Sequence, residues 1–142
     1  MSRMLAIDYG LKRVGIAVTD ISKIIARPLV TVSPEEIMTF LHEYFISEDV
    51  DTVILGYAAD VSKDADIVKA TEKLFVKLKN IFCDKHIELY DERYTSKIAY
   101  HMLINGGFKK KDRNQKKNID MMSACILLQS YMDMLKIRKS TP

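Results

Sequence analysis

Short apolar runs alternate with polar turns over the first part of the chain. Met4–Tyr9, Val14–Thr19 and Ile24–Val32 are each rich in Ile, Val, Leu and Ala, as buried strands are. The connections between them are short, and Gly10 marks the first as a tight turn. Pro28 places the third run at a sheet edge or a kink. The pattern predicts three strands joined as an antiparallel meander.

Beyond residue 32 the apolar spacing becomes helical. The sequence Ser33-Pro34-Glu35-Glu36 has the form of a capping box with proline at the first helical position, so it predicts a helix start. The remaining predicted elements are a strand at Val53–Leu55, a helix from about Ala65 to Leu78, a strand at Ile87–Tyr90, a helix from Thr95 or Ser96 to Asn105-Gly106-Gly107, and a largely buried helix from Asn118 to about Ile137. This order predicts one α/β domain, residues 1–142, with a five-stranded mixed sheet flanked by helices.

Composition narrows the class of protein. The 142 residues are 48% hydrophobic and 29% charged, which is typical of a globular domain. No apolar run approaches the roughly 18 residues of a membrane span, so we expect no membrane association. Cys83 and Cys125 lack metal-ligand spacing and lie on apolar segments, and we expect buried free thiols and a cytoplasmic location.

The basic charge is concentrated in one stretch. Residues Lys109–Lys117 hold six cations and one acid, whereas the rest of the chain has 16 cations and 18 acids. The stretch is either a solvated loop or an arm that contacts the phosphates of nucleic acid. Charge alone does not separate these two interpretations.

Acids stand at the ends of three predicted buried elements. Asp8 is near the end of the first strand, Glu92 follows the strand at Ile87–Tyr90 with Asp91 beside it, and Asp120 is in the first turn of the last helix. Sites in open α/β sheets lie outside the carboxyl ends of strands, so parallel first and fifth strands would bring these acids together. Clustered carboxylates need a cation, and oxygen ligands favour Mg²⁺.

Each acid also has a purely structural explanation. Asp120 could favour the positive end of the helix dipole, and Asp8 could accept hydrogen bonds from turn amides. Asp91 or Glu92 could pair with Arg93. Spacing alone leaves both interpretations open.

Four stretches resemble the YqgF family, whose members are described as pre-16S rRNA nucleases or Holliday junction resolvases with a ribonuclease H-like fold. The stretches are IDYGLKRVGIAVTD (Ile7–Asp20), VILGYA (Val53–Ala58), DERYTSKIA (Asp91–Ala99) and KKNIDMMSACILLQSYMD (Lys116–Asp133). Their order and spacing cover nearly the whole chain. One departure is Gly56-Tyr57-Ala58-Ala59-Asp60, which lacks the proline and the later glycine usual in the family.

The resemblance implies a function for each group of residues. Asp8, Glu92 and Asp120 would be catalytic ligands of one or two Mg²⁺ or Mn²⁺ ions, with Asp91 the alternative to Glu92. Phosphates of the substrate would be contacted by Lys12, Arg13 and Arg93. The charge of the basic stretch separately predicts nucleic-acid binding by Lys109, Lys110, Lys111, Arg113, Lys116 and Lys117. The residues expected to support the site are Gly10, Gly15, Gly56, Asp91 and Thr95.

The implied activity is hydrolysis of phosphodiester bonds in structured nucleic acid. We favour processing of the 5′ end of pre-16S rRNA, with ribosomal precursor particles as partners. The alternatives are a resolvase of four-way DNA, which would need a dimer, and a binding or assembly factor without catalysis. The sequence leaves open whether the protein is a monomer or a homodimer. Actin-like phosphotransferases resemble the first motif, but they need a second phosphate loop and a much longer chain.

Overall fold

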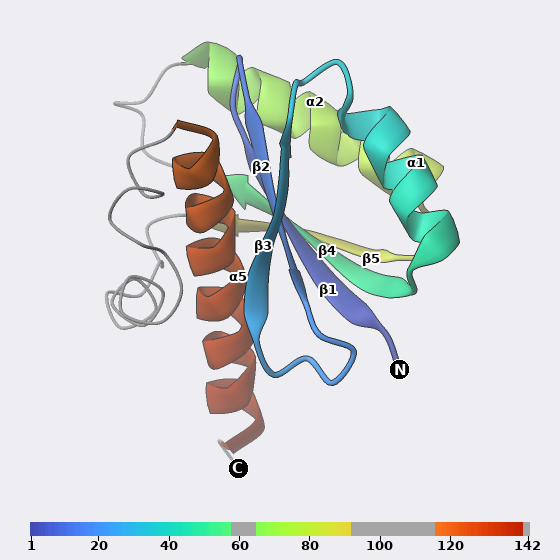
Figure 1. Ribbon diagram of the computed structural model, residues 1–142, viewed down its shortest axis with the longest axis vertical. Helices are drawn as coiled ribbons and strands as arrows, with labels where there is room; N and C mark the ends of the chain where they lie inside the picture. The colour runs from blue at the N-terminus through green and yellow to red at the C-terminus, as the bar shows by residue number, and fades with distance from the viewer. Residues whose placement is uncertain (58–64, 92–115, 141–142) are drawn as a thin grey trace.

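A five-stranded sheet with helices on both faces forms the described part of the molecule (Figure 1). The computed structural model describes residues 1–57, 65–91 and 116–140. The strands are β1 (Arg3–Tyr9), β2 (Val14–Thr19), β3 (Ala26–Val32), β4 (Val50–Tyr57) and β5 (His86–Asp91), and the helices are α1 (Ile37–Ser47), α2 (Ala65–Ile81) and α5 (Lys116–Ser140).

The strand order is β3-β2-β1-β4-β5. β2 pairs with β1 and β3 in antiparallel fashion, while β1, β4 and β5 are parallel to one another. This confirms the mixed sheet and the antiparallel first three strands. It also confirms that the first and fifth strands run in the same direction, so their carboxyl ends share one edge of the sheet.

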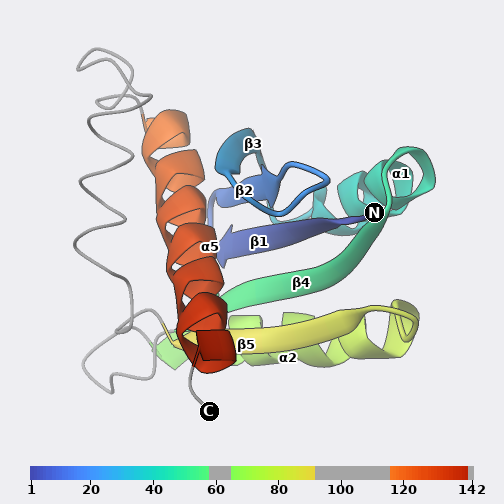
Figure 2. The same cartoon turned by 90° about the horizontal axis from the view of Figure 1, so that it is seen from below.

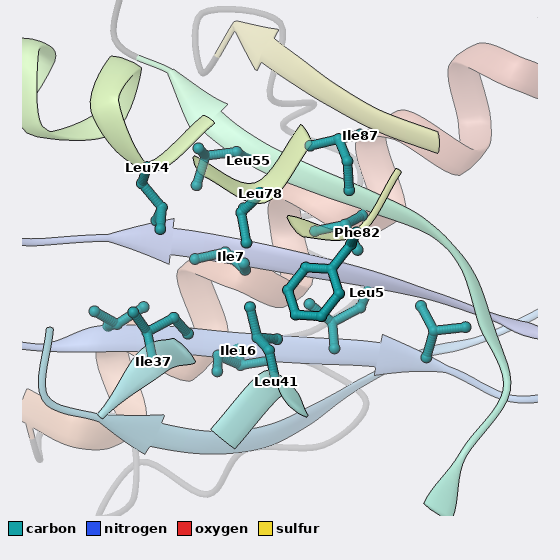
Figure 3. Packing of buried hydrophobic residues seen from close by; sticks show 13 residues of the cluster. Leu5, Ile7, Ile16, Ile37, Leu41, Leu55, Leu74, Leu78, Phe82 and Ile87 are labelled. Carbon is teal, nitrogen blue, oxygen red and sulfur yellow. The ribbon is translucent and has the colours of Figure 1, made fainter. Parts of the chain in front are cut away.

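The two faces of the sheet are covered by different helices (Figure 2). On one face α1 and α2 bury a cluster that includes Leu5, Ile7 and Ile16, whose side chains point towards Leu41 and Leu78 in Figure 3. On the other face α5 packs against β1, β2 and β3 around a second cluster, whose members from the sheet are Met4, Ala6, Ala17, Ala26, Ile54 and Tyr90. Alternate residues of each strand therefore belong to opposite faces.

Two predicted boundaries are wrong. The third strand begins at Ala26 because the amides of Ile24 and Ile25 each donate to the Asp20 carboxylate at 2.8 Å and so belong to a turn. α1 begins at Ile37, because residues 34–36 form a turn and Ser33 donates its hydroxyl to the Glu36 carboxylate at 2.6 Å instead of capping a helix amide. The capping-box residues do meet, but one turn before the helix.

The bounds of β2 are as predicted, and those of β1, β4, α2, β5 and α5 extend the predicted ranges by a few residues, most of all in β4 and α5. The helix predicted from Thr95 or Ser96 to Asn105 lies outside the described residues. Cys125 is buried, as expected, but Cys83 is exposed just after α2, so the prediction for that thiol is wrong. Both thiols are free, as predicted. Within the described ranges, none of the helices combines the length and the apolar character that crossing a membrane requires.

Candidate metal centre at the carboxyl edge of the sheet

Asp8 lies near the carboxyl end of β1 on the face that α5 covers. Ala6, two residues before it, packs in the cluster under α5, whereas its neighbours Ile7 and Tyr9 pack on the α1/α2 side. Alternation along the strand therefore directs Asp8 towards α5. It is only partly buried, at the open end of an otherwise buried strand.

Asp120 is brought to the same place by a close contact between α5 and β2. Gly15 on β2 is the register partner of Asp8 on β1. A Cβ atom placed on Gly15 would lie 2.1 Å from the main-chain oxygen of Asp120, so the helix backbone occupies the space of a side chain. Directly opposed antiparallel residues are about 5 Å apart at Cα, so Gly15 places the backbones of both acids beside one position on the sheet.

Arg13, in the turn between β1 and β2, forms an ion pair with Asp120. Its Nε donates to Oδ2 of Asp120 at 2.8 Å across 107 residues of sequence. The side chain of Arg13 is 42% exposed and that of Asp120 is 23% exposed, so the pair is partly accessible to solvent. An ion pair this accessible contributes at most about 1 kcal/mol. It determines which way the Asp120 carboxylate points more than it stabilises the fold.

The contribution of the fifth strand depends on which of two adjacent acids faces α5. Tyr90 packs under α5 and its hydroxyl lies 3.1 Å from the Ser130 hydroxyl, whereas Leu89 packs on the α1/α2 side. Alternation places Asp91, the last residue of β5, on the α1/α2 side, opposite to Asp8. This favours Glu92 as the third ligand, although Glu92 lies outside the described residues.

Gly56 on β4 lies between Asp8 and the end of β5. Ile7 pairs with Leu55, so Gly56 is level with Asp8, and it pairs with Tyr90 on its other side. Ile54 belongs to the cluster under α5, so Gly56 is on the face of Asp8. β1 and β5 lie on either side of β4, so their backbones are about 10 Å apart. Because Gly56 has no side chain, β4 puts none between Asp8 and the end of β5.

The residues present fit a divalent cation. Asp8 and Asp120 supply hard carboxylate oxygens on one face, which are the donors that Mg²⁺ and Mn²⁺ prefer. Among residues 1–57, 65–91 and 116–140, no group of three or more His, Cys, Asp or Glu side chains is suited to hold a metal. The third carboxylate of the predicted set, Glu92, falls outside those ranges.

Tyr9, next to Asp8, faces the other side of the sheet. Its pKa is raised above the usual value by partial burial and by the negative charge of Glu35. The phenol is therefore neutral at physiological pH. Neither its position nor its charge suits it as a base for the Asp8 site.

The remaining predicted site residues divide by location. Lys12 is exposed in the same turn as Arg13, and Gly10 begins that turn with no room for a Cβ, which would lie 2.5 Å from the carbonyl oxygen of Arg13. Lys116 and Lys117 are on the first turn of α5. The predicted residues outside the described ranges are Glu92, Arg93, Thr95, Lys109, Lys110, Lys111 and Arg113.

Two features of the site escaped the sequence interpretation. The sequence predicts that Gly15 supports the site, but it does not predict the contact of Gly15 with the backbone of Asp120. It predicts that Arg13 contacts a substrate phosphate, whereas in the structure Arg13 pairs with Asp120, a predicted metal ligand. A glycine inside a six-residue buried strand was the available signal, because glycine weakens a strand unless another backbone approaches closely.

Comparison with known families identifies the chain. The model of the family described as "RuvX: Holliday junction resolvase" matches residues 2–134. The chain belongs to the RuvX family. This is the family also called YqgF, so the resemblance carried by the four sequence stretches is confirmed.

Curated RuvX relatives match over nearly their whole length. The protein of Amoebophilus asiaticus is 47% identical over 96% of this chain and 97% of its own, and that of Flavobacterium psychrophilum is 46% identical over 93% and 97%. Both carry the name "Putative pre-16S rRNA nuclease".

A solved structure supports the fold. RuvC of T. thermophilus, in complex with a Holliday junction substrate, superposes with a TM-score of 0.62 at 14% identity, covering 94% of this chain and 96% of that one. At this identity the likeness concerns the fold alone. The predicted ribonuclease H-like architecture is confirmed.

Proposed function

We propose that the protein is a metal-dependent nuclease that hydrolyses phosphodiester bonds in structured nucleic acid. The observation that supports the proposal is the approach of the Asp8 and Asp120 backbones to Gly15, because it brings two acids of a RuvX chain to one edge of the sheet. Glu92 completes the set. These three residues hold one or two Mg²⁺ or Mn²⁺ ions, which supply a Lewis acid and a water of lowered pKa.

The cations around the carboxylates bind and orient the substrate. Lys12 and Arg13 stand in the turn at the end of β1, where an exposed phosphate can approach Asp8. Arg93 and the stretch Lys109–Lys117 add positive charge, and basic clusters bind nucleic acid by releasing counterions. Supported by Gly10, Gly56 and Thr95, these groups fix the scissile phosphodiester at the carboxylates.

The preferred substrate is the 5′ end of pre-16S rRNA, in ribosome biogenesis. This choice is supported by the names of the curated relatives, which share 38–47% identity with the chain. Ribosomal precursor particles are then the partners and the cytoplasm is the location. Cleavage of four-way DNA is the alternative, supported by the description of the matching family.

A cleavage assay with two substrates tests the proposal. End-labelled pre-16S rRNA and a four-way DNA junction are each incubated in Mg²⁺ or Mn²⁺ with the wild-type chain and with Asp8→Asn. We expect cutting of the RNA that is lost in Asp8→Asn. Symmetric cutting of the junction alone would replace the RNA function by resolution of DNA.

Absence of cleavage by the wild-type chain would favour the interpretation that the protein is an assembly factor without catalysis. In that case neither substrate is cut although both are bound. Complementation of a strain that lacks the protein then distinguishes catalysis from binding. Asp8→Asn would restore ribosome assembly in that strain, whereas a variant with neutralised Lys109–Lys117 would not. Chelation by EDTA provides the control for metal dependence.

A further inference from the structure

The ion pair between Arg13 and Asp120 joins two residues expected to have different partners in the working protein. Asp120 is a proposed metal ligand and Arg13 a proposed phosphate contact, yet they meet at 2.8 Å. A carboxylate that binds a divalent cation gains little from an adjacent guanidinium, because the two cations repel each other. Binding of a metal by Asp120 would therefore weaken this pair.

The backbone of Asp120 does not depend on this pair. It is held by its contact with Gly15, where the main-chain oxygen fills the position of a Cβ atom. Arg13 lies two residues before Gly15, at the exposed end of the turn. Release of Arg13 can therefore change the direction of the carboxylate while the helix and the strand stay in place.

We propose that Arg13 is the counter-ion of Asp120 only in the metal-free protein, and that metal binding releases it to a phosphate of the substrate. The proposal rests on the metal site of the proposed function. It makes the binding of nucleic acid at this position stronger when metal is bound, because Asp120 then no longer competes with a phosphate for Arg13. The opposite role is a supporting one, in which Arg13 holds Asp120 while the metal is bound.

Metal affinity separates these two roles. We measure Mn²⁺ binding by electron paramagnetic resonance in the wild type, Arg13→Gln and Lys12→Gln. Lys12 is an exposed cation in the same turn, so Lys12→Gln matches the change in net charge. If Arg13 competes with the metal, Arg13→Gln lowers the Kd about two- to fivefold, as expected for an accessible ion pair, and more than Lys12→Gln does. A higher Kd in Arg13→Gln, or equal effects of the two variants, would overturn the proposal.

A nuclear magnetic resonance titration observes the release in the wild type. The Nε–H signal of Arg13, assigned by its loss in Arg13→Lys, is compared with its position in metal-free Asp120→Asn, in which the ionic partner is absent. We expect saturating Mg²⁺ to move the wild-type signal towards that reference position. If Mg²⁺ binds and the signal stays, Arg13 remains paired, so the release is wrong while the metal site stands. If Mg²⁺ does not bind, both the release and the proposed metal site fail.

Binding of a short RNA stem-loop tests the second half of the proposal. In Ca²⁺, which uses the same class of oxygen ligands, we expect Arg13→Gln to bind the RNA more weakly than the wild type. In EDTA the difference between the two should be up to about fivefold smaller, since pairing with Asp120 then competes with the phosphate for Arg13. An equal loss of affinity in both conditions would show that Arg13 contacts the phosphate without regard to metal.

Discussion

The main-chain oxygen of Asp120 lies where the side chain of residue 15 would begin. An ideal Cβ on Gly15 is 2.1 Å from that oxygen and 3.0 Å from the amide nitrogen of Met121. Both neighbours are backbone atoms of α5, which cannot move aside as a flexible side chain can. The absence of a side chain at this one position allows the backbone of Asp120 to approach β2 beside the register partner of Asp8.

Gly15→Ala should therefore damage the fold and the site together. A methyl group would force α5 away from β2, and overpacking of this kind costs about 3 kcal/mol of the free energy of unfolding. We expect a lower melting temperature by calorimetry and weaker Mn²⁺ binding.

A control on the same strand and face distinguishes these effects. Ala17→Gly costs about 1 kcal/mol of stability and leaves the Gly15 contact intact, so Mn²⁺ binding should not change. Unaltered Mn²⁺ affinity in Gly15→Ala would show that the contact does not position Asp120.

The two adjacent acids after β5 should behave differently. Asp91 lies on the α1/α2 side by alternation, so Asp91→Asn should lower cleavage less than about tenfold. Glu92→Gln should lower it at least about a hundredfold, because losing a ligand should cost more than the roughly 10- to 100-fold loss caused by removing a group that only supports one. Mn²⁺ affinity provides a second measurement that does not require a substrate. Equal losses, or a larger loss in Asp91→Asn, would contradict the assignment of Glu92.

The basic stretch should determine the salt dependence of nucleic-acid binding. Changing Lys109, Lys110 and Lys111 to Gln should reduce the slope of log K against log salt by about 2–3, because each lost phosphate contact removes one released counterion.

The control changes three exposed lysines of α2, on the far side of the sheet from α5. Replacing Lys69, Lys73 and Lys77 by Gln gives the same change in net charge. The slope should then remain near that of the wild type. If both triple variants lower the slope equally, only overall charge matters and the stretch is not a specific arm.

The two thiols should differ in reactivity. Burial between α5 and the sheet raises the pKa of Cys125 to about 12, so almost no thiolate exists at pH 8, whereas Cys83 is exposed. Iodoacetamide should label one thiol in the native protein and two after denaturation, as mass spectrometry can count.

Cys83→Ser provides the control for this labelling. The native variant should remain unlabelled, because its one remaining thiol is buried. Rapid labelling of Cys125 in that variant would show that α5 separates from the sheet on the timescale of the reaction.

The sequence by itself determined the elements and the edge of the sheet at which the acids gather. Strands such as Val14–Thr19 are short apolar runs between polar turns, and such runs need no distant partner to be recognised. The first and fifth strands were expected to end at acids, and their parallel direction confirmed one shared edge. The local capping-box pattern at Ser33 predicted the helix start too early, because Ser33 and Glu36 pair with each other before the helix begins.

Only the tertiary structure decided which atoms meet at that edge. The contact of Gly15 with Asp120 and the pair of Asp120 with Arg13 join residues more than 100 positions apart. Such contacts depend on how one helix lies on the sheet, which no local period encodes. The face of Asp91 was likewise settled only when Tyr90 was found under α5, because alternation gives two faces and packing decides which is which.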